Sequence, residues 1–384
     1  MAGSLISQGS RILVVLAGMA IPVGVAWAQA LDFELFTRLT HKVLKVEAMN
    51  TDGSVSMGTG VLVGDGFVVT NCHVTARARA IELVRGEFRW EVEAQRADVE
   101  HDLCVLRAPH SGDLAPAEMS FDAPQIGQAV HAVGFIFGIA PRLNVGVINA
   151  LHDYDGAKIV QSTTPFTSGA SGGGLFDDKG RLVGIVTFRY RAGEAFHFSL
   201  PVSWVVDAIA HFDGQTVAPL KGTPFWGRPR DQQPHFLRAA TYAAEGDWQG
   251  MAHVASEWTR LEPDSASAWR TLGVSKSRLK QLDAAVPALR RSVSLDGGYA
   301  PTWYELGLAL AGSGNRSEAT AVQHTLQGLN EKLSKDRADV VKAYLVKTYA
   351  LKNIETVGRA SEQPKDTSDP TAAVNRRIEF VPEW

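Results

Sequence analysis

A serine stands in a glycine-rich turn, residues 167–174 (TSGASGGG). Small neighbours leave the Ser171 hydroxyl accessible, and glycines let backbone N–H groups converge where side chains would collide. Two such N–H groups would stabilise the negative oxygen that develops when an acyl carbon is attacked. Many loops share this composition, so the turn indicates chemistry only if partner residues lie elsewhere in the chain.

Two earlier residues are candidates for those partners. His73 ends a predicted strand in the stretch TNCHV, which places it at the rim of a sheet. Asp102 stands at the entrance to the apolar run LCVL, where a carboxylate needs a hydrogen-bond partner. The order His73, Asp102, Ser171 predicts a nucleophilic triad. His73 would take the Ser171 proton, while Asp102 would hold the imidazole and stabilise its protonated form.

The sequences around these residues resemble the trypsin/chymotrypsin-like serine peptidases, most closely their bacterial HtrA/Deg branch, over about residues 40–211. The resemblance rests on GTGVLV at 58–63, TNCHV at 70–74, HDL at 101–103 and GASGG at 169–173. It implies two packed six-stranded β-barrels with the triad in the cleft between them. It also implies that the N–H groups of Gly169 and Ser171 form the oxyanion hole and that no cofactor is needed.

The chain departs from that family at two positions beside the nucleophile. Ala170 stands where the family usually has Asp or Asn, and Gly174 where it commonly has proline. Neither side chain transfers the proton, so the departures concern the rigidity of the loop. By the same resemblance, five residues border the specificity pocket: Pro165, Thr187, Phe188, Arg189 and Phe196. Apolar walls without an acidic floor predict cleavage after small or medium aliphatic residues.

The elements that must position these residues are short β-branched strands separated by turns. They are predicted at 43–48, 60–63, 67–70, 130–134, 142–151, 158–161, 182–188 and 196–200, with a closing helix at 203–211. The peptidase domain would therefore span 35–211.

The second half of the chain has helical periodicity. After a Gly/Pro-rich linker at 212–233, AWRTLG at 268–273 recurs as TWYELG at 302–307. An offset of about 34 residues is typical of tetratricopeptide (TPR) repeats, which are predicted over 234–352 with a capping helix at 335–351. Trp269 and Trp303 would be core residues. The predicted fold is multidomain: an all-β chymotrypsin-like double barrel followed by an all-α TPR-type domain.

The predicted repeats suit protein binding, because stacked helix pairs leave a concave groove. We expect them to recruit protein substrates or partners and to sit beside the barrels without completing the barrel cores. The alternative is that the helices only stabilise the peptidase half.

The segment 1–30 is typical of a signal peptide. Arg11 precedes an apolar run, and small residues offer cleavage after Ala28 or Ala30. The protein would then be periplasmic or secreted, whereas an uncleaved segment would anchor it in the inner membrane. A net charge of -3 argues against a nucleic-acid surface spread over the chain. The tail at 353–384 is predicted to be flexible.

The chain has two cysteines, Cys72 beside His73 and Cys104 beyond Asp102. Since His73 and Asp102 must approach one another, a disulfide is predicted in an oxidising compartment, and two buried free thiols are the alternative. Two cysteines and scattered histidines show no ligand pairing typical of zinc, so no metal is predicted.

Taken together, these features predict an exported serine endopeptidase that hydrolyses peptide bonds. One alternative is a catalytically weak or inactive protease-fold scaffold that binds proteins through its repeats. Another is an esterase with the same triad, because the fold does not separate peptide from ester hydrolysis.

Overall fold

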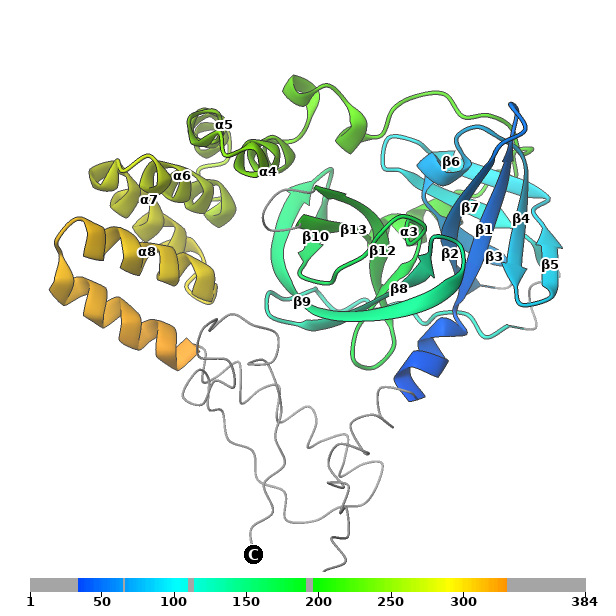
Figure 1. The fold of residues 1–384 in the computed structure, drawn as a ribbon, viewed down its shortest axis with the longest axis horizontal. Coiled ribbons are helices and arrows are strands. Elements are labelled where there is room, and N and C mark those ends of the chain that lie inside the picture. The colour runs from blue at the N-terminus through cyan, green and yellow to red at the C-terminus, as the bar shows by residue number, and fades with distance from the viewer. Residues whose placement is uncertain (1–33, 65, 110–113, 191–195, 330–384) are drawn as a thin grey trace, which may run out of the picture.

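The structure is a computed structural model that describes residues 34–64, 66–109, 114–190 and 196–329 (Figure 1). Two β-rich bodies lie side by side and a stack of helices lies beyond the second one. The predicted signal peptide, the capping helix and the tail lie outside the described residues. No helix in the described ranges is long and apolar enough to cross a membrane.

The first β body is a seven-stranded antiparallel sheet in the order β5-β4-β1-β2-β3-β7-β6. Its strands are β1 Val43–Asn50, β2 Val55–Gly64, β3 Phe67–Thr70, β4 Ala78–Arg85, β5 Phe88–Glu91, β6 Ala94–Asp98 and β7 Leu103–Arg107. The predicted six-stranded barrel is therefore wrong in detail. Gly86, at φ 58°, lets β5 fold back on β4 as a seventh strand. After β5 the chain crosses from the β4 side of the sheet to the β7 side. Val92 N–H donates to Ile81 O of β4 (3.0 Å), and Glu93 N–H donates to Arg107 O of β7 (2.9 Å).

The second β body is a closed six-stranded barrel, as predicted, in the order β10-β13-β12-β11-β8-β9. Its strands are β8 Ala129–Ile136, β9 Ala140–Tyr154, β10 Ala157–Ser162, β11 Gly174–Phe176, β12 Leu182–Tyr190 and β13 Phe196–Pro201. Closure depends on the long strand β9, whose first half pairs with β8 and whose second half pairs with β10. Helix α3, Val202–Ala210, follows.

The helical half repeats itself. Its helices are α4 His235–Glu245, α5 Trp248–Leu261, α6 Ala266–Arg278, α7 Leu282–Leu295 and α8 Ala300–Gly312, and residues 316–329 are also helical. Helices α7 and α8 begin and end at one constant offset from α5 and α6, which is the offset of the sequence repeat. The indole N–H of Trp269 donates to Pro263 O, and that of Trp303 donates to Gly297 O, at the same offset. Both tryptophans are half-buried.

One hydrophobic cluster spans the two halves. Phe225, Phe236 and Trp258, which all follow the barrels in sequence, belong to the same cluster of buried residues as Phe198 of β13. The Phe236 ring stacks on His152 of β9 with centroids 4.4 Å apart. The expectation that the helical half leaves the barrel cores untouched is therefore wrong. Aromatic side chains of the Gly/Pro-rich stretch and of α4 reach into the core.

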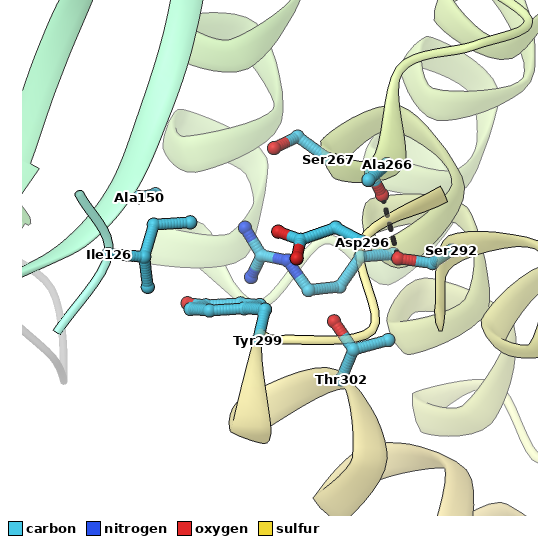
Figure 2. Close-up of a pocket in the computed structure, with 9 residues that line it drawn as sticks. Ile126, Ala150, Ala266, Ser267, Ser292, Asp296, Tyr299 and Thr302 are labelled. Atoms are coloured by element: carbon cyan, nitrogen blue, oxygen red, sulfur yellow. Dashed lines mark hydrogen bonds between the residues drawn. The ribbon is translucent and has the colours of Figure 1, made fainter. Parts of the chain in front are cut away.

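Part of the helical surface also faces the second barrel. Figure 2 shows a small pocket there, with Ile126 and Ala150 on the barrel side. The helical side supplies Ala266, Ser267, Ser292, Asp296, Tyr299 and Thr302. The guanidinium of Arg270, which also lines the pocket, lies over the Tyr299 ring at 4.8 Å. This portion of the repeats is consequently not open as a groove.

Candidate active site

His73 and Asp102 come from two neighbouring strands of the first sheet. His73 lies in the single turn α2, Cys72–Thr75, directly after β3, and Asp102 directly precedes β7. The imidazole Nδ1 lies 2.7 Å from Asp102 Oδ2, and the His73 backbone N–H donates to Oδ1 (2.8 Å). Because an ionised carboxylate only accepts, Nδ1 carries the hydrogen and Nε2 is left as the acceptor. That tautomer is the one a general base requires.

The backbone around Asp102 is fixed by the residues that directly follow β3. Asp102 has φ 59°, a left-handed conformation that Asp tolerates better than most residues. Its carbonyl accepts hydrogen bonds from Asn71 Nδ2 (3.0 Å) and from the Cys72 N–H (3.2 Å). A disulfide joins Cys72 to Cys104, with Cα atoms 4.9 Å apart. The acid and the base are thereby held on two strands that are both hydrogen-bonded and cross-linked.

The loop around Ser171 presents two free backbone N–H groups. The Ser168 carbonyl accepts from Phe137 N–H (2.9 Å), and in a trans peptide the Gly169 N–H must point the opposite way. Neither Gly169 N–H nor Ser171 N–H has an acceptor among the described residues. Gly169 adopts φ 93°, and a Cβ there would lie 2.5 Å from Phe135 O, so the position requires glycine. These are the two N–H groups that the sequence predicts for the oxyanion hole, and that role stays a prediction.

Thr59 of β2 ties this loop to both β bodies. Its hydroxyl donates to Gly169 O (2.7 Å) and accepts from Phe135 N–H (2.8 Å). Its backbone N–H donates to Ser171 O (2.8 Å). The residue is completely buried. The Thr59 side chain thus fixes the carbonyl of Gly169 and the adjacent strand β8. The Thr59 backbone fixes the carbonyl of the nucleophile.

The Ser171 hydroxyl is not hydrogen-bonded to His73 among the described contacts. It donates to Thr187 O at 3.4 Å. Asn71 Nδ2 also donates to Thr187 Oγ1 (3.0 Å), so one buried amide connects the Asp102 carbonyl with the residue that holds the serine. The structure therefore joins the acid to the base directly and relates the serine to them through Asn71 and Thr187.

Comparison with known proteins relates part of the chain to peptidases. Residues 58–185 match the family model described as a trypsin-like peptidase domain. The chain contains a trypsin-like peptidase domain. The chain is 31% identical over 153 residues to the magnetosome formation protease MamE of Paramagnetospirillum magneticum. The matched region covers 37% of this chain and 21% of that protein. It is also 34% identical over 137 residues to a probable periplasmic serine endoprotease, DegP-like, of Ectopseudomonas mendocina. This matched region covers 34% of this chain and 29% of that protein.

A solved structure, the serine endoprotease from Yersinia pestis, is also similar, with 24% identity and a TM-score of 0.42. The match covers 46% of this chain and 65% of that one. The chain spans less than a third of the length of the two curated relatives described above. What those proteins do as a whole is therefore not transferred directly.

The predicted specificity residues of the peptidase domain have different surroundings. Pro165 is exposed, Thr187 is buried, and Arg189 donates to Phe166 O (2.9 Å). Phe188, which is predicted to border the specificity pocket, is buried. Its ring is 7% exposed and stacks on Phe198 at 4.8 Å and on Trp226 at 5.3 Å, because aromatic residues beyond the barrel pack over it. The Phe196 side chain lies outside the described part of the structure.

Trp226 is a site residue that the sequence reasoning missed. Its indole Nε1–H donates to Asp102 Oδ2 (3.1 Å), and its ring lies edge-on to His73 with centroids 5.4 Å apart. It belongs to the short 3-10 helix Phe225–Gly227 inside the stretch assigned as a linker. The signal that could have revealed it is the adjacent aromatic pair Phe225-Trp226 in an otherwise Gly/Pro-rich segment.

A second histidine, His101, adjoins Asp102 but does not compete as the base. Its Nδ1 lies 2.7 Å from Asp98 Oδ2 and its Nε2 2.8 Å from Asp155 Oδ2. Burial lowers the pKa of His101, but the hydrogen bonds and charges of the two carboxylates outweigh burial and raise the pKa above its ordinary value. With both ring nitrogens occupied, His101 has no free nitrogen for a substrate proton, whereas His73 keeps Nε2 available.

Proposed function

We propose that this chain is an exported serine endopeptidase in which Ser171 attacks the scissile carbonyl and His73 takes the serine proton. Asp102 holds the imidazole and stabilises the imidazolium, and the N–H groups of Gly169 and Ser171 bind the developing oxyanion. The observation that carries the proposal is the fully buried Asp102 carboxylate on His73 Nδ1, together with a Ser171 loop in which two N–H groups have no acceptor among the described residues.

The proposed reaction needs one local rearrangement. The Ser171 hydroxyl must leave Thr187 O and donate to His73 Nε2. Hydrogen bonds between nucleophile and base often tighten only when substrate is present. If the Ser171 hydroxyl stays on Thr187 O, this hydrogen bond favours the second candidate, a protease-fold scaffold without useful turnover.

A fluorophosphonate probe separates the two candidates, because it reacts covalently only with an activated serine. We expect the wild-type chain to be labelled and Ser171→Ala to remain unlabelled. A casein digest then tests peptide hydrolysis, and a small acyl ester tests the esterase alternative. A folded wild-type chain that is not labelled would support the scaffold.

The finer parts of the proposal concern export and the helical half. Export is supported by the segment 1–30 and by the relative whose name calls it periplasmic. TPR-type repeats are supported by the constant offset between helices α5, α6 and their copies α7, α8. We propose that the repeats hold protein substrates or partners in addition to supporting the barrel.

Exposed side chains distinguish holding a substrate from support. Tyr304 and Leu308 lie one turn apart on α8 and are 55% and 47% exposed. If the repeats hold protein substrates on this face, Tyr304→Ser with Leu308→Ser slows casein cleavage and leaves fluorophosphonate labelling unchanged. If the repeats only support the barrel, the rate of casein cleavage and the rate of fluorophosphonate labelling both stay at the wild-type level.

A further inference from the structure

The segment that follows the second barrel passes both β bodies before it reaches the helices. Gln215 bridges to Gln95 of β6, and the Leu220 N–H donates to Ala76 O (2.8 Å) behind α2. The Phe225 N–H then donates to Glu100 O (2.9 Å), two residues before Asp102. Figure 1 shows this segment passing over the top of the view, between the β bodies and α4.

The part of this segment next to Asp102 is itself well fixed. Phe225 is completely buried, Arg228 forms an ion pair with Glu100, and the Gln233 side chain donates to the carbonyls of Trp226 and Arg228 (both 2.9 Å). Gln233 lies two residues before α4. The position of the Trp226 indole is consequently set from both sides, by the turn before β7 and by the start of the helical half.

The buried Asp102 carboxylate has donors from two residues only, among the contacts described. His73 supplies its backbone N–H to Oδ1 and its Nδ1–H to Oδ2, and Trp226 supplies its Nε1–H to Oδ2 (3.1 Å). A buried carboxylate keeps its orientation through such donors. Trp226 is therefore the one donor described at this carboxylate that does not come from the base itself.

We propose that Trp226 is a positioning residue of the catalytic site, delivered by the segment that connects the peptidase domain to the helical half. This inference rests on the proposed function and deepens it. The indole N–H fixes the Asp102 carboxylate so that Oδ2 faces His73 Nδ1 when the imidazole takes the Ser171 proton. Its ring, packed against Phe188, closes the side of the His73–Asp102 pair. The acid and base thus depend on residues outside the double-barrel sequence.

The test compares fluorophosphonate labelling rates of the full chain carrying Trp226→Phe, Trp226→Ala or the matched control Trp258→Phe. Trp258 is a buried tryptophan of the cluster against which the half-buried Trp226 packs, and its indole nitrogen has no hydrogen-bond partner among the described residues. We expect Trp226→Phe to slow labelling about tenfold, because a hydrogen bond to a charged group is lost. Trp226→Ala should be only slightly slower, and Trp258→Phe should label at the wild-type rate once the folded fraction is equal.

A packing role alone gives the opposite order. Trp226→Phe would then label close to the wild-type rate and Trp226→Ala much more slowly, and that result would overturn the inference. Equal slowing by Trp226→Phe and Trp258→Phe would overturn it too.

A readout that does not depend on activity keeps this inference separate from the proposed function. The proton between His73 Nδ1 and Asp102 gives a far-downfield resonance in proton NMR spectra, assigned by its loss in His73→Ala. Trp226→Phe should change the chemical shift of this resonance, since it removes a second donor from the same oxygen, and Trp258→Phe should not. An unchanged shift in Trp226→Phe contradicts the inference even if the wild-type chain is labelled. A changed shift in a chain that is not labelled sustains it while the proposed activity fails.

Discussion

The two arms of the active site are held in different ways. The Ser171 loop is fixed by backbone hydrogen bonds and by the buried Thr59 hydroxyl, all from within the two β bodies. The His73–Asp102 pair also lies on the first sheet but takes a hydrogen bond from Trp226, beyond the second barrel. Among the contacts described, the geometry of the Ser171 loop is therefore set within the β half, whereas that of the His73–Asp102 pair extends into the connecting segment.

The largest effect on activity should come from removing the reacting side chains of the Ser171 loop and of the His73–Asp102 pair. We expect Ser171→Ala and His73→Ala each to lower kcat/KM for peptide hydrolysis by on the order of 10⁴-fold or more, and Asp102→Asn by a similar factor. The double variant Ser171→Ala with His73→Ala should lose little more than either single one, because the residues act as a unit. Losses that multiply would mean that the two arms do not serve one reaction.

The next largest effect tests whether the connecting segment belongs to the peptidase core. Phe225 is completely buried among barrel residues, so Phe225→Ala should lower the free energy of unfolding by about 3–5 kcal/mol through lost contacts and a cavity. Urea denaturation measures the change. The control Phe88→Ala, at a ring 70% exposed on β5, should change stability by less than about 0.5 kcal/mol. A Phe225→Ala change as small as the control would return the segment to the role of a linker.

The contrast between contacts within the β half and contacts with the connecting segment also explains which features the sequence could predict. Local signals predicted β3, which the structure has at Phe67–Thr70, and the resemblance to trypsin-like peptidases implied the six strands with which the second barrel closes. His73 and Asp102 meet as predicted, because paired strands place the residues that follow β3 beside those that precede β7. These contacts follow from the antiparallel pairing of β3 with β7.

The rest of the site depends on contacts between residues far apart in the chain, which no local pattern encodes. Trp226 lies 124 residues after Asp102, in a stretch whose glycines and prolines indicate a loop but not its course. Thr59 stood inside the motif GTGVLV, yet its hydroxyl reaches a loop 110 residues away. The burial of Phe188 likewise follows from that unpredicted course.

A smaller effect isolates the serine arm. Thr59→Val keeps the shape of the side chain and removes the hydroxyl that holds Gly169 O and Phe135 N–H. We expect fluorophosphonate labelling to slow by roughly 10²-fold, comparable with the loss of an oxyanion donor, because the loop is no longer fixed. Thr59→Ser keeps the hydroxyl and should stay within a few-fold of wild type. If both variants label equally well, the loop is held by its backbone hydrogen bonds alone.

The smallest predicted effect concerns the junction between the second barrel and the helical half. His152 is buried between Gln161, which its Nε2 contacts at 2.9 Å, and the Phe236 ring of α4. Burial lowers the pKa of His152 from 6.5 to about 4. The unfolded chain takes up a proton near the ordinary value, and the folded protein does so only near the lowered one. Stability is therefore present above pH 6.5 and is lost as the pH falls toward 4.

Between pH 7.5 and pH 5 this single group should remove about 2 kcal/mol of stability, from the pKa difference and roughly 1.36 kcal/mol per unit. His152→Phe keeps an aromatic ring against Phe236 and removes the titration, so its loss of stability over this range should be smaller than that of wild type by that amount. Urea denaturation at both pH values measures the difference. The control His253→Phe, at an exposed position on α5, should keep the wild-type pH dependence.

The same titration connects the junction to the acid and base arm. Because His152 contacts α4, its protonation should weaken the packing that places the connecting segment, so acid should slow fluorophosphonate labelling less in His152→Phe than in wild type. An identical pH dependence of stability in His152→Phe and wild type would show that the junction does not exclude the charged imidazole. The acid and base arm would then owe nothing to this contact.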